Sequence, residues 1–285
     1  MFRDYLSVRI KNIVFPFLFW VAAGAVAELL AAGLIIVTGQ NRGDFFTALS
    51  LAHEKWEIWL VLFRAVVTVP LFIRRFREDS RRIQLELPKH RTGLPERREF
   101  FRPPEHFFWY ELLCIPVGVS FMIFMSLFLQ ILGVSDAAFP AAFQTNHMAE
   151  FAGLILLQVI AGPLSEELLI RGLIYRRLRT WSRLTAAVMV SSVLFAFMHW
   201  NLSQLLYAFF FGLVLAFLYE GSGTLRDSVL AHGAANLAAV LLWYNTGLSE
   251  AVISRSGLAA VCAGVLFFGC FFVFMYFANR RDRAD

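Results

Sequence analysis

The sequence has 285 residues, of which 59% are hydrophobic and 16% charged, with 31 phenylalanines and a mean hydropathy of +0.63. Soluble domains carry about 25% charged residues, so this composition excludes an ordinary soluble protein. A net charge of +5 could suit nucleic-acid binding, but the sequence contains no soluble basic domain and no nucleic-acid-binding motif. We therefore expect the lipid bilayer, and no nucleic acid, as a partner.

Apolar runs long enough to cross a membrane recur along the chain. A membrane-spanning helix takes about 20 residues, and the sequence offers eight stretches near that length: residues 13–37, 57–73, 108–134, 149–170, 184–199, 203–219, 228–244 and 257–278. The second is the weakest because it contains Arg64 and Pro70, and an interfacial segment is its alternative. The sequence thus predicts an all-α fold, a polytopic transmembrane helix bundle of about eight spans.

The distribution of basic residues predicts the orientation of these spans. Lysines and arginines gather before the first span, in residues 74–102 and 171–183, and after the last span. The connectors on the other side hold only Arg42, Lys55 and Arg255. Since basic connectors face the cytoplasm, we expect both termini to be cytoplasmic. The protein is predicted to be a multi-pass integral membrane protein, of the cytoplasmic membrane if its source is bacterial.

One polar segment divides the chain. Residues 74–107 contain four prolines and many charges, and predict a cytoplasmic linker with an amphipathic helix near Arg81–Leu87. The linker and the hairpin of spans before it form a predicted N-terminal region, residues 1–107. The remaining residues, 108–285, form a predicted C-terminal membrane bundle.

Charged residues inside an apolar run are costly and therefore mark candidate functional positions. Glu166 and Glu167 follow an apolar run that begins at Phe151, and Arg171 comes four residues after Glu167. Neighbouring helical residues point about 100° apart, so an ion pair between Glu167 and Arg171 leaves Glu166 free for proton transfer. The alternative is that both glutamates lie at the membrane interface. Pro163 is expected to loosen the turn before them.

Two further polar motifs lie in later spans. His199 ends an apolar helix, where a capping role is the alternative. His232 and Asn236 are four residues apart and share one helix face, where they could instead form an interhelical hydrogen-bond pair. Taken with Glu166, these residues supply an acid–base group, an orienting partner and oxyanion donors, the set that a hydrolase needs.

The predicted topology raises a question of depth. It places Glu166 and His232 toward the cytoplasmic ends of their spans, and His199 toward the opposite end of its own. A shared site therefore requires the fifth span to be tilted or short, or its turn to dip into the membrane.

These three motifs, Glu166-Glu167-x-x-x-Arg171, Phe195-x-x-x-His199 and His232-x-x-x-Asn236, resemble the signature motifs of the CPBP family. That family includes the type II CAAX prenyl endopeptidases and bacterial proteins of the abortive-infection type. The resemblance covers about residues 150–245 and implies an intramembrane endopeptidase acting on a membrane-associated protein or peptide.

The resemblance also implies a role for each residue. Glu166 and His199 would activate a water molecule, and His232 and Asn236 would stabilise the oxyanion. Glu167 and Arg171 would support them.

The motifs leave two questions open, the metal and the function itself. Glu166, His199 and His232 could hold zinc, but the two histidines lie on different helices and no HExxH motif is present. We therefore favour a mechanism without a cofactor. A non-catalytic membrane scaffold or immunity protein of the same family is the alternative function, and a transporter with polar residues along its path is another.

Overall fold

The computed structural model describes residues 2–39, 44–86, 107–134, 148–199 and 202–281, and within these ranges the chain contains helices and no β-strand. The predicted all-α fold is therefore confirmed. The elements are α1 (Phe2–Val37), α2 (Phe45–Glu86), α3 (Phe107–Ile131), α4 (Met148–Leu154), η2 (Ile155–Ala161), α5 (Gly162–Glu167), η3 (Leu168–Tyr175), α6 (Arg176–Trp181), α7 (Leu184–Ala196), α8 (Leu202–Ser222), α9 (Leu225–Tyr244), α10 (Thr246–Ile253) and α11 (Ser256–Arg281).

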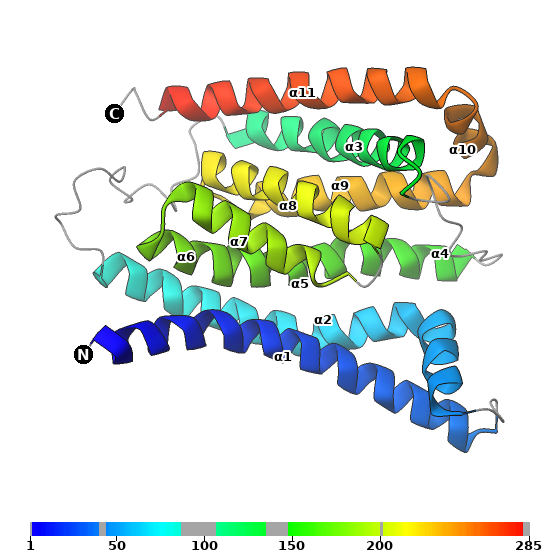
Figure 1. Cartoon of the computed structure of the whole chain (residues 1–285), viewed down its shortest axis with the longest axis horizontal. Coiled ribbons are helices and arrows are strands. Elements are labelled where there is room, and N and C mark those ends of the chain that lie inside the picture. Colours follow the sequence, from blue (N-terminus) through cyan, green and yellow to red (C-terminus); the bar gives the residue numbers. More distant parts are fainter. Residues whose placement is uncertain (1, 40–43, 87–106, 135–147, 200–201, 282–285) are drawn as a thin grey trace.

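The long helices lie roughly along one common direction (Figure 1). Helices α1 and α2 pack on each other at one edge of the bundle, and α3 lies between α9 and α11 toward the other edge. The consecutive elements from α4 to α6 form one long helical segment in the middle, which contacts α2 on one side and α9 on the other. This central segment carries Glu166, Glu167 and Arg171, so the bundle surrounds them with helices from both halves of the chain.

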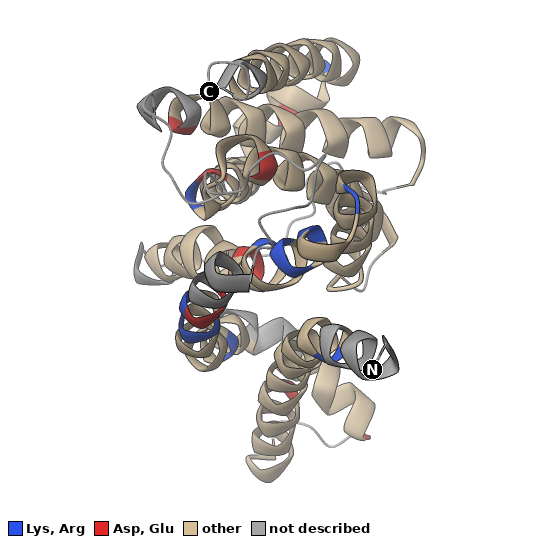
Figure 2. Cartoon of the chain, turned by 90° about the vertical axis from the view of Figure 1, so that its left-hand side faces the viewer, with Lys and Arg blue, Asp and Glu red and all other residues tan. Residues whose placement is uncertain are grey.

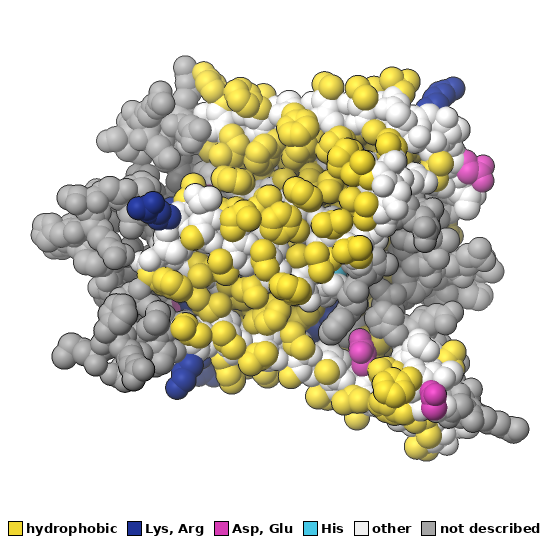
Figure 3. All heavy atoms as spheres, in the orientation of Figure 1, with side chains coloured by type: hydrophobic (Ala, Val, Ile, Leu, Met, Phe, Trp, Pro, Cys, Tyr) yellow, Lys and Arg dark blue, Asp and Glu magenta, His cyan; other side chains and the backbone are white. Residues whose placement is uncertain are grey.

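The outer surface of the bundle is apolar, as a protein embedded in lipid requires. Large hydrophobic side chains such as Phe15 (64% exposed), Val265 (71%) and Phe272 (73%) are exposed. Hydrophobic side chains cover most of the face of the molecule seen in Figure 3. Among the described residues, five helices are long and apolar enough to cross a membrane: Ile10–Val37, Glu111–Ile131, Phe151–Trp181, Leu202–Ser222 and Ser256–Ala278. The chain is an integral multi-pass membrane protein.

Three of the eight predicted spans differ from these five helices. Helix α7 is apolar but has only 13 residues. Helices α2 and α9 are long enough but carry more polar side chains, among them Arg64 in α2 and Arg226, Asp227 and His232 in α9. The count of eight spans and the cytoplasmic placement of both termini remain predictions.

Helix α2 extends well beyond the second predicted span. It is bent at Trp56, whose φ of −125° and ψ of 15° are not helical, and it then continues to Glu86. Residues 74–86 are therefore helical, a range that includes most of the amphipathic helix predicted near Arg81–Leu87; the division of the chain at this linker remains a prediction. The helix persists because these residues pack against the central segment; the Arg176 guanidinium, for example, lies 4.2 Å from the centre of the Phe76 ring. Residues 87–106 of the predicted linker lie outside the described residues.

The arginines after Glu167 are buried, where the sequence predicts a cytoplasmic connector over residues 171–183. The helix continues to Trp181, and Arg171, Arg176 and Arg179 are at most 3% exposed. Each arginine has a partner: Arg171 with Glu167, Arg176 with the carbonyl of Phe76, Arg177 with Asp79, and Arg179 with Glu220. Figure 2 views the end of the molecule that carries the last three pairs. The helix therefore extends past residue 170, the predicted end of the fourth span, and these pairs offset part of the cost of burying charge. The cytoplasmic placement of these residues remains a prediction.

Small residues allow helices to approach closely around the site. A Cβ atom added to Gly118 of α3 would overlap the carbonyl oxygen of Ala231 in α9. Close backbone contact of this kind is typical of helix packing in membranes. It fixes α9, and with it the neighbouring His232, against the rest of the bundle.

Candidate functional site: a buried cluster of glutamate and histidine

The central segment changes its helical geometry on both sides of the two glutamates. The six residues of α5 lie between two π-helices, η2 and η3. The amide of Gly162 donates to the carbonyl of Leu157, and that of Arg176 to the carbonyl of Arg171, each five residues back. The first π-helix ends at Ala161, two residues before Pro163, at the turn that the sequence predicts to be loosened. π-helical turns are frequent at functional sites, and here they frame Glu166 and Glu167.

Glu167 and Arg171 form the ion pair that their spacing predicts. Arg171 Nη1 lies 2.7 Å from Glu167 Oε1, and neither side chain is exposed. Arg171 Nη2 also donates to the carbonyl of Gly212 in α8 (3.0 Å), and the guanidinium lies 4.7 Å from the centre of the Phe195 ring. The pair thus ties the central segment to α7 and α8.

His232 lies between the two neighbouring glutamates. Its Nδ1 is 3.1 Å from Glu167 Oε1, a hydrogen-bonding distance, and its Nε2 is 3.8 Å from Glu166 Oε2. The rings of Phe195 and Phe211 stand nearly perpendicular to the imidazole, with centroids 5.6 Å and 5.5 Å away. When Nδ1–H donates to Glu167, the opposite nitrogen is directed toward Glu166. The surroundings therefore fix which edge of His232 faces Glu166.

Glu166 differs from Glu167 in its access to solvent. Its side chain is 14% exposed, whereas that of Glu167 is fully buried. The 3.8 Å between Glu166 Oε2 and His232 Nε2 is too long for a direct hydrogen bond. One water molecule could bridge a separation of this kind. The two adjacent carboxylates therefore have different tasks available to them.

His199 reaches this cluster because α7 is short. Thirteen residues at a rise of about 1.5 Å extend about 20 Å, against about 30 Å for the hydrocarbon core of a bilayer. The helix ends at Ala196, and His199 lies in the turn that follows, with Nδ1 3.2 Å from the carbonyl of Phe195. Glu166 and His232 are both electrostatic neighbours of its imidazole. The short helix corresponds to one of the three solutions to the question of depth that the sequence leaves open.

Asn236 lies one helical turn beyond His232 and contacts the first π-helix. Its Nδ2 donates to the carbonyl of Gln158 (2.8 Å). A Cβ atom on Gly233, between the two, would lie only 2.7 Å from the carbonyl oxygen of Val159, so only glycine fits this contact. An amide nitrogen has two hydrogens, and one hydrogen bond to Gln158 leaves the second available.

The structure joins most of the predicted site residues through direct contacts. Glu166, Glu167, Arg171 and His232 are linked by hydrogen bonds or ion pairs, His199 adjoins them electrostatically, and Asn236 extends the same face of α9. Sequence reasoning missed Gln158, which accepts from Asn236, and Phe211, which packs on His232. A glutamine inside an apolar run is a signal that could have identified Gln158. Phe211, one of 31 phenylalanines, gives no such signal.

The predicted alternative zinc ligands do not form a metal site in this arrangement. Over the described ranges, no three His, Cys, Asp or Glu side chains are grouped as a bound metal ion requires. Glu166 and His232 are close, but His199 does not complete a set with them. The mechanism without a cofactor remains a prediction.

Comparison with known proteins supports the resemblance drawn from the motifs. Residues 148–238 match the family model of Rce1-like type II CAAX prenyl endopeptidases. The matched range contains all three motifs and the whole cluster from Gln158 to Asn236. No curated protein and no solved structure matches the chain in the corresponding searches.

Proposed function

Because residues 148–238 match the family model of Rce1-like type II CAAX prenyl endopeptidases, we propose that this protein hydrolyses a peptide bond of a membrane-associated protein or peptide. Water is the nucleophile, and Glu166 with His199 activates it. His232 and Asn236 stabilise the oxyanion, while Glu167 and Arg171 position His232.

The observation that carries this proposal is the difference between the two adjacent glutamates. Glu167 is fully buried and already bonded to Arg171 and His232, so its carboxylate is committed to structure. Glu166 keeps 14% of its side chain exposed and lies 3.8 Å from His232 Nε2. A general base needs access to the proton that it removes, and Glu166 has that access.

The reaction then follows from the positions of these groups. Glu166 takes a proton from the water molecule while the water oxygen forms a bond to the scissile carbonyl carbon. The C–N bond breaks when the amine nitrogen receives a proton, which returns from Glu166. An apolar site strengthens each of these electrostatic interactions because little solvent screens them.

The oxyanion that exists between water attack and C–N bond cleavage needs hydrogen-bond donors. Asn236 offers its second Nδ2 hydrogen, with the first held by the carbonyl of Gln158. His232 donates through Nε2 when both of its nitrogens are protonated, and Glu167 accepts from its Nδ1. Glu167 therefore orients the imidazole.

The test compares membrane-fraction proteomes of cells with the wild-type chain and with Glu166→Gln. We expect an uncleaved precursor to accumulate with the variant, because loss of a general base slows a reaction by about 10²–10⁴-fold. Glu111→Gln is the matched control: Glu111 pairs with Arg226, away from the cluster. Normal processing by Glu166→Gln at equal protein level would exclude the mechanism. A cellular phenotype that this variant still supports would favour the scaffold function.

A further inference from the structure

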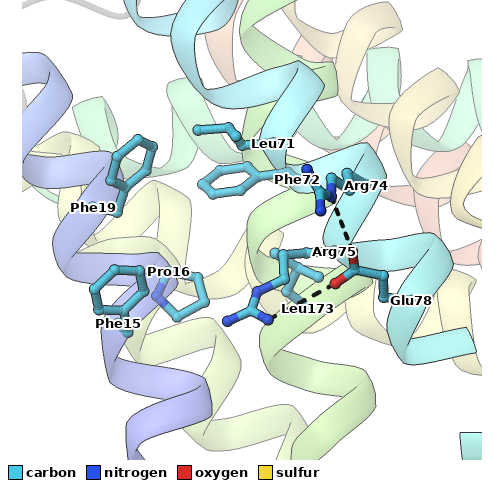
Figure 4. Close-up of a pocket in the computed structure, with 9 residues that line it drawn as sticks. All are labelled: Phe15, Pro16, Phe19, Leu71, Phe72, Arg74, Arg75, Glu78 and Leu173. Carbon is cyan, nitrogen blue, oxygen red and sulfur yellow. Dashed lines mark hydrogen bonds and ion pairs between the residues drawn. The ribbon is translucent and has the colours of Figure 1, made fainter. Parts of the chain in front are cut away.

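A cavity of about 290 Å³ lies between α1, α2 and η3, apart from the glutamate–histidine cluster. Figure 4 shows the side chains that line it. Phe72 of α2 (3% exposed) and Leu173 of η3 (0%) form its buried wall. Phe15 and Phe19 line it from α1. The cavity is therefore lined by both the N-terminal hairpin and the helical segment that carries the candidate site.

The cavity opens toward the lipid-facing surface of the protein. Phe15 is 64% exposed and Leu71 is 47% exposed, and both line the cavity. In a membrane protein, outward apolar side chains contact acyl chains, so the opening is reached from the bilayer. The cavity lining near this opening is almost entirely apolar and suits a hydrocarbon chain.

Two arginines stand at the polar end of the same cavity. The side chains of Arg74 and Arg75 are 80% and 46% exposed. Both contact one carboxylate: Arg74 Nε lies 3.0 Å from Glu78 Oε1, and Arg75 Nη1 lies 3.9 Å from Glu78 Oε2 (Figure 4). Two cations and one anion leave one net positive charge at this opening. Exposed pairs of this kind contribute little stability, so an incoming anion can exchange with Glu78 at small cost.

We propose that this cavity binds an anionic membrane phospholipid. One acyl chain lies among Phe15, Phe19 and Leu173, and the headgroup phosphate is held by Arg74 and Arg75, whose guanidinium groups match phosphate geometry. An uncharged isoprenoid would fill the apolar part but give the arginines no partner. A free phosphate would reach the arginines but leave the apolar cavity unused. The bound lipid would contact α1, α2 and η3 together and hold the N-terminal hairpin against the central segment.

The proposal is tested with the full chain purified in detergent. Dioleoyl phosphatidylglycerol and dioleoyl phosphatidylcholine are titrated separately, and bound lipid is measured by native mass spectrometry. We expect the protein to bind phosphatidylglycerol more tightly than phosphatidylcholine. The variant Arg74→Gln/Arg75→Gln should lower phosphatidylglycerol affinity by about fivefold for each arginine. Arg77→Gln, at an exposed position of the same helix that does not line the cavity, is the matched control and should bind normally.

Four outcomes would overturn the proposal. Equal binding of the two lipids would show that the headgroup is not recognised. Undiminished phosphatidylglycerol binding by the double variant, or an equal loss in Arg77→Gln, would place the lipid elsewhere. In a competition measurement, a prenylated peptide is added to the protein with bound lipid. If the peptide displaces the lipid from the wild type but not from the double variant, the cavity is a substrate-binding site. Size-exclusion elution and a thermal melt test whether each variant is folded. We expect both variants to fold because Arg74 and Arg75 are exposed.

Discussion

Replacing Arg171 with leucine should destabilise the bundle strongly. The substitution removes a guanidinium that pairs with Glu167 at 2.7 Å and donates to the carbonyl of Gly212 at 3.0 Å, in a position with no exposed surface. Glu167 would then be a buried carboxylate with His232 as its remaining neighbour. Leucine fills much of the space, so the lost charge and hydrogen bonds dominate the effect.

The magnitude follows from the burial of the pair. Removing one partner of a buried ion pair costs about 3–5 kcal/mol, because the other charge is left uncompensated. In Glu167→Gln/Arg171→Leu both charges are gone, and the glutamine oxygen can still accept from His232 Nδ1. The double variant should therefore lose only about 1–2 kcal/mol, mainly through the hydrogen bond to Gly212. Adding Glu167→Gln to Arg171→Leu should therefore restore about 2–3 kcal/mol of the free energy of unfolding.

The free energy of unfolding can be measured in detergent micelles by denaturant titration, with tryptophan fluorescence as the signal; the chain has 7 tryptophans. Arg226→Leu is the matched control, because Arg226 also pairs with a glutamate, Glu111, but is 60% exposed. Its loss should cost at most about 1 kcal/mol. The reasoning is refuted if Arg171→Leu costs no more than Arg226→Leu, or if the double variant is less stable than Arg171→Leu.

Three other predictions concern the candidate site and its packing. Asn236→Ala should lower kcat about 10²–10³-fold with the protein still folded, as loss of an oxyanion donor does; unchanged turnover of an identified substrate would exclude that role. Gly118→Val should lower Tm because a side chain there overlaps the Ala231 carbonyl, whereas Gly33→Ala, which meets nothing within 4 Å, should not; equal melting temperatures would contradict the close contact. Activity of the purified protein should survive 1,10-phenanthroline, and a loss that added zinc restores would show metal dependence.

Several features of the site could be predicted from local sequence. The i,i+4 spacing of Glu167 and Arg171 sets their side chains on one helix face, and the pair is present. The same spacing puts His232 and Asn236 together on α9. The neighbouring positions of Glu166 and Glu167 already indicated different roles for the two carboxylates. These relations depend only on helix geometry, which a sequence carries.

The depth of His199 could not be predicted in this way. The apolar run continues through Met198, so composition alone does not show that the helix ends at Ala196. The burial of Arg176 and Arg179 was likewise missed, because their partners, Phe76 and Glu220, lie 100 and 41 residues away. In the sequence, an arginine in a connector cannot be distinguished from an arginine in a packed helix interface, because the residue that pairs with it is not known.

What the sequence by itself determined is the environment and the chemistry: an apolar all-helical protein of the membrane, with a carboxylate, imidazoles and a carboxamide in three ordered motifs. Composition sets the first, and side-chain type sets the second. Only the tertiary structure decided that a short helix brings His199 toward Glu166 and that His232 lies between two glutamates. It also decided that α1 and α2 form a cavity with the central segment. These outcomes depend on contacts between helices distant in sequence, where packing and partner availability prevail over local pattern.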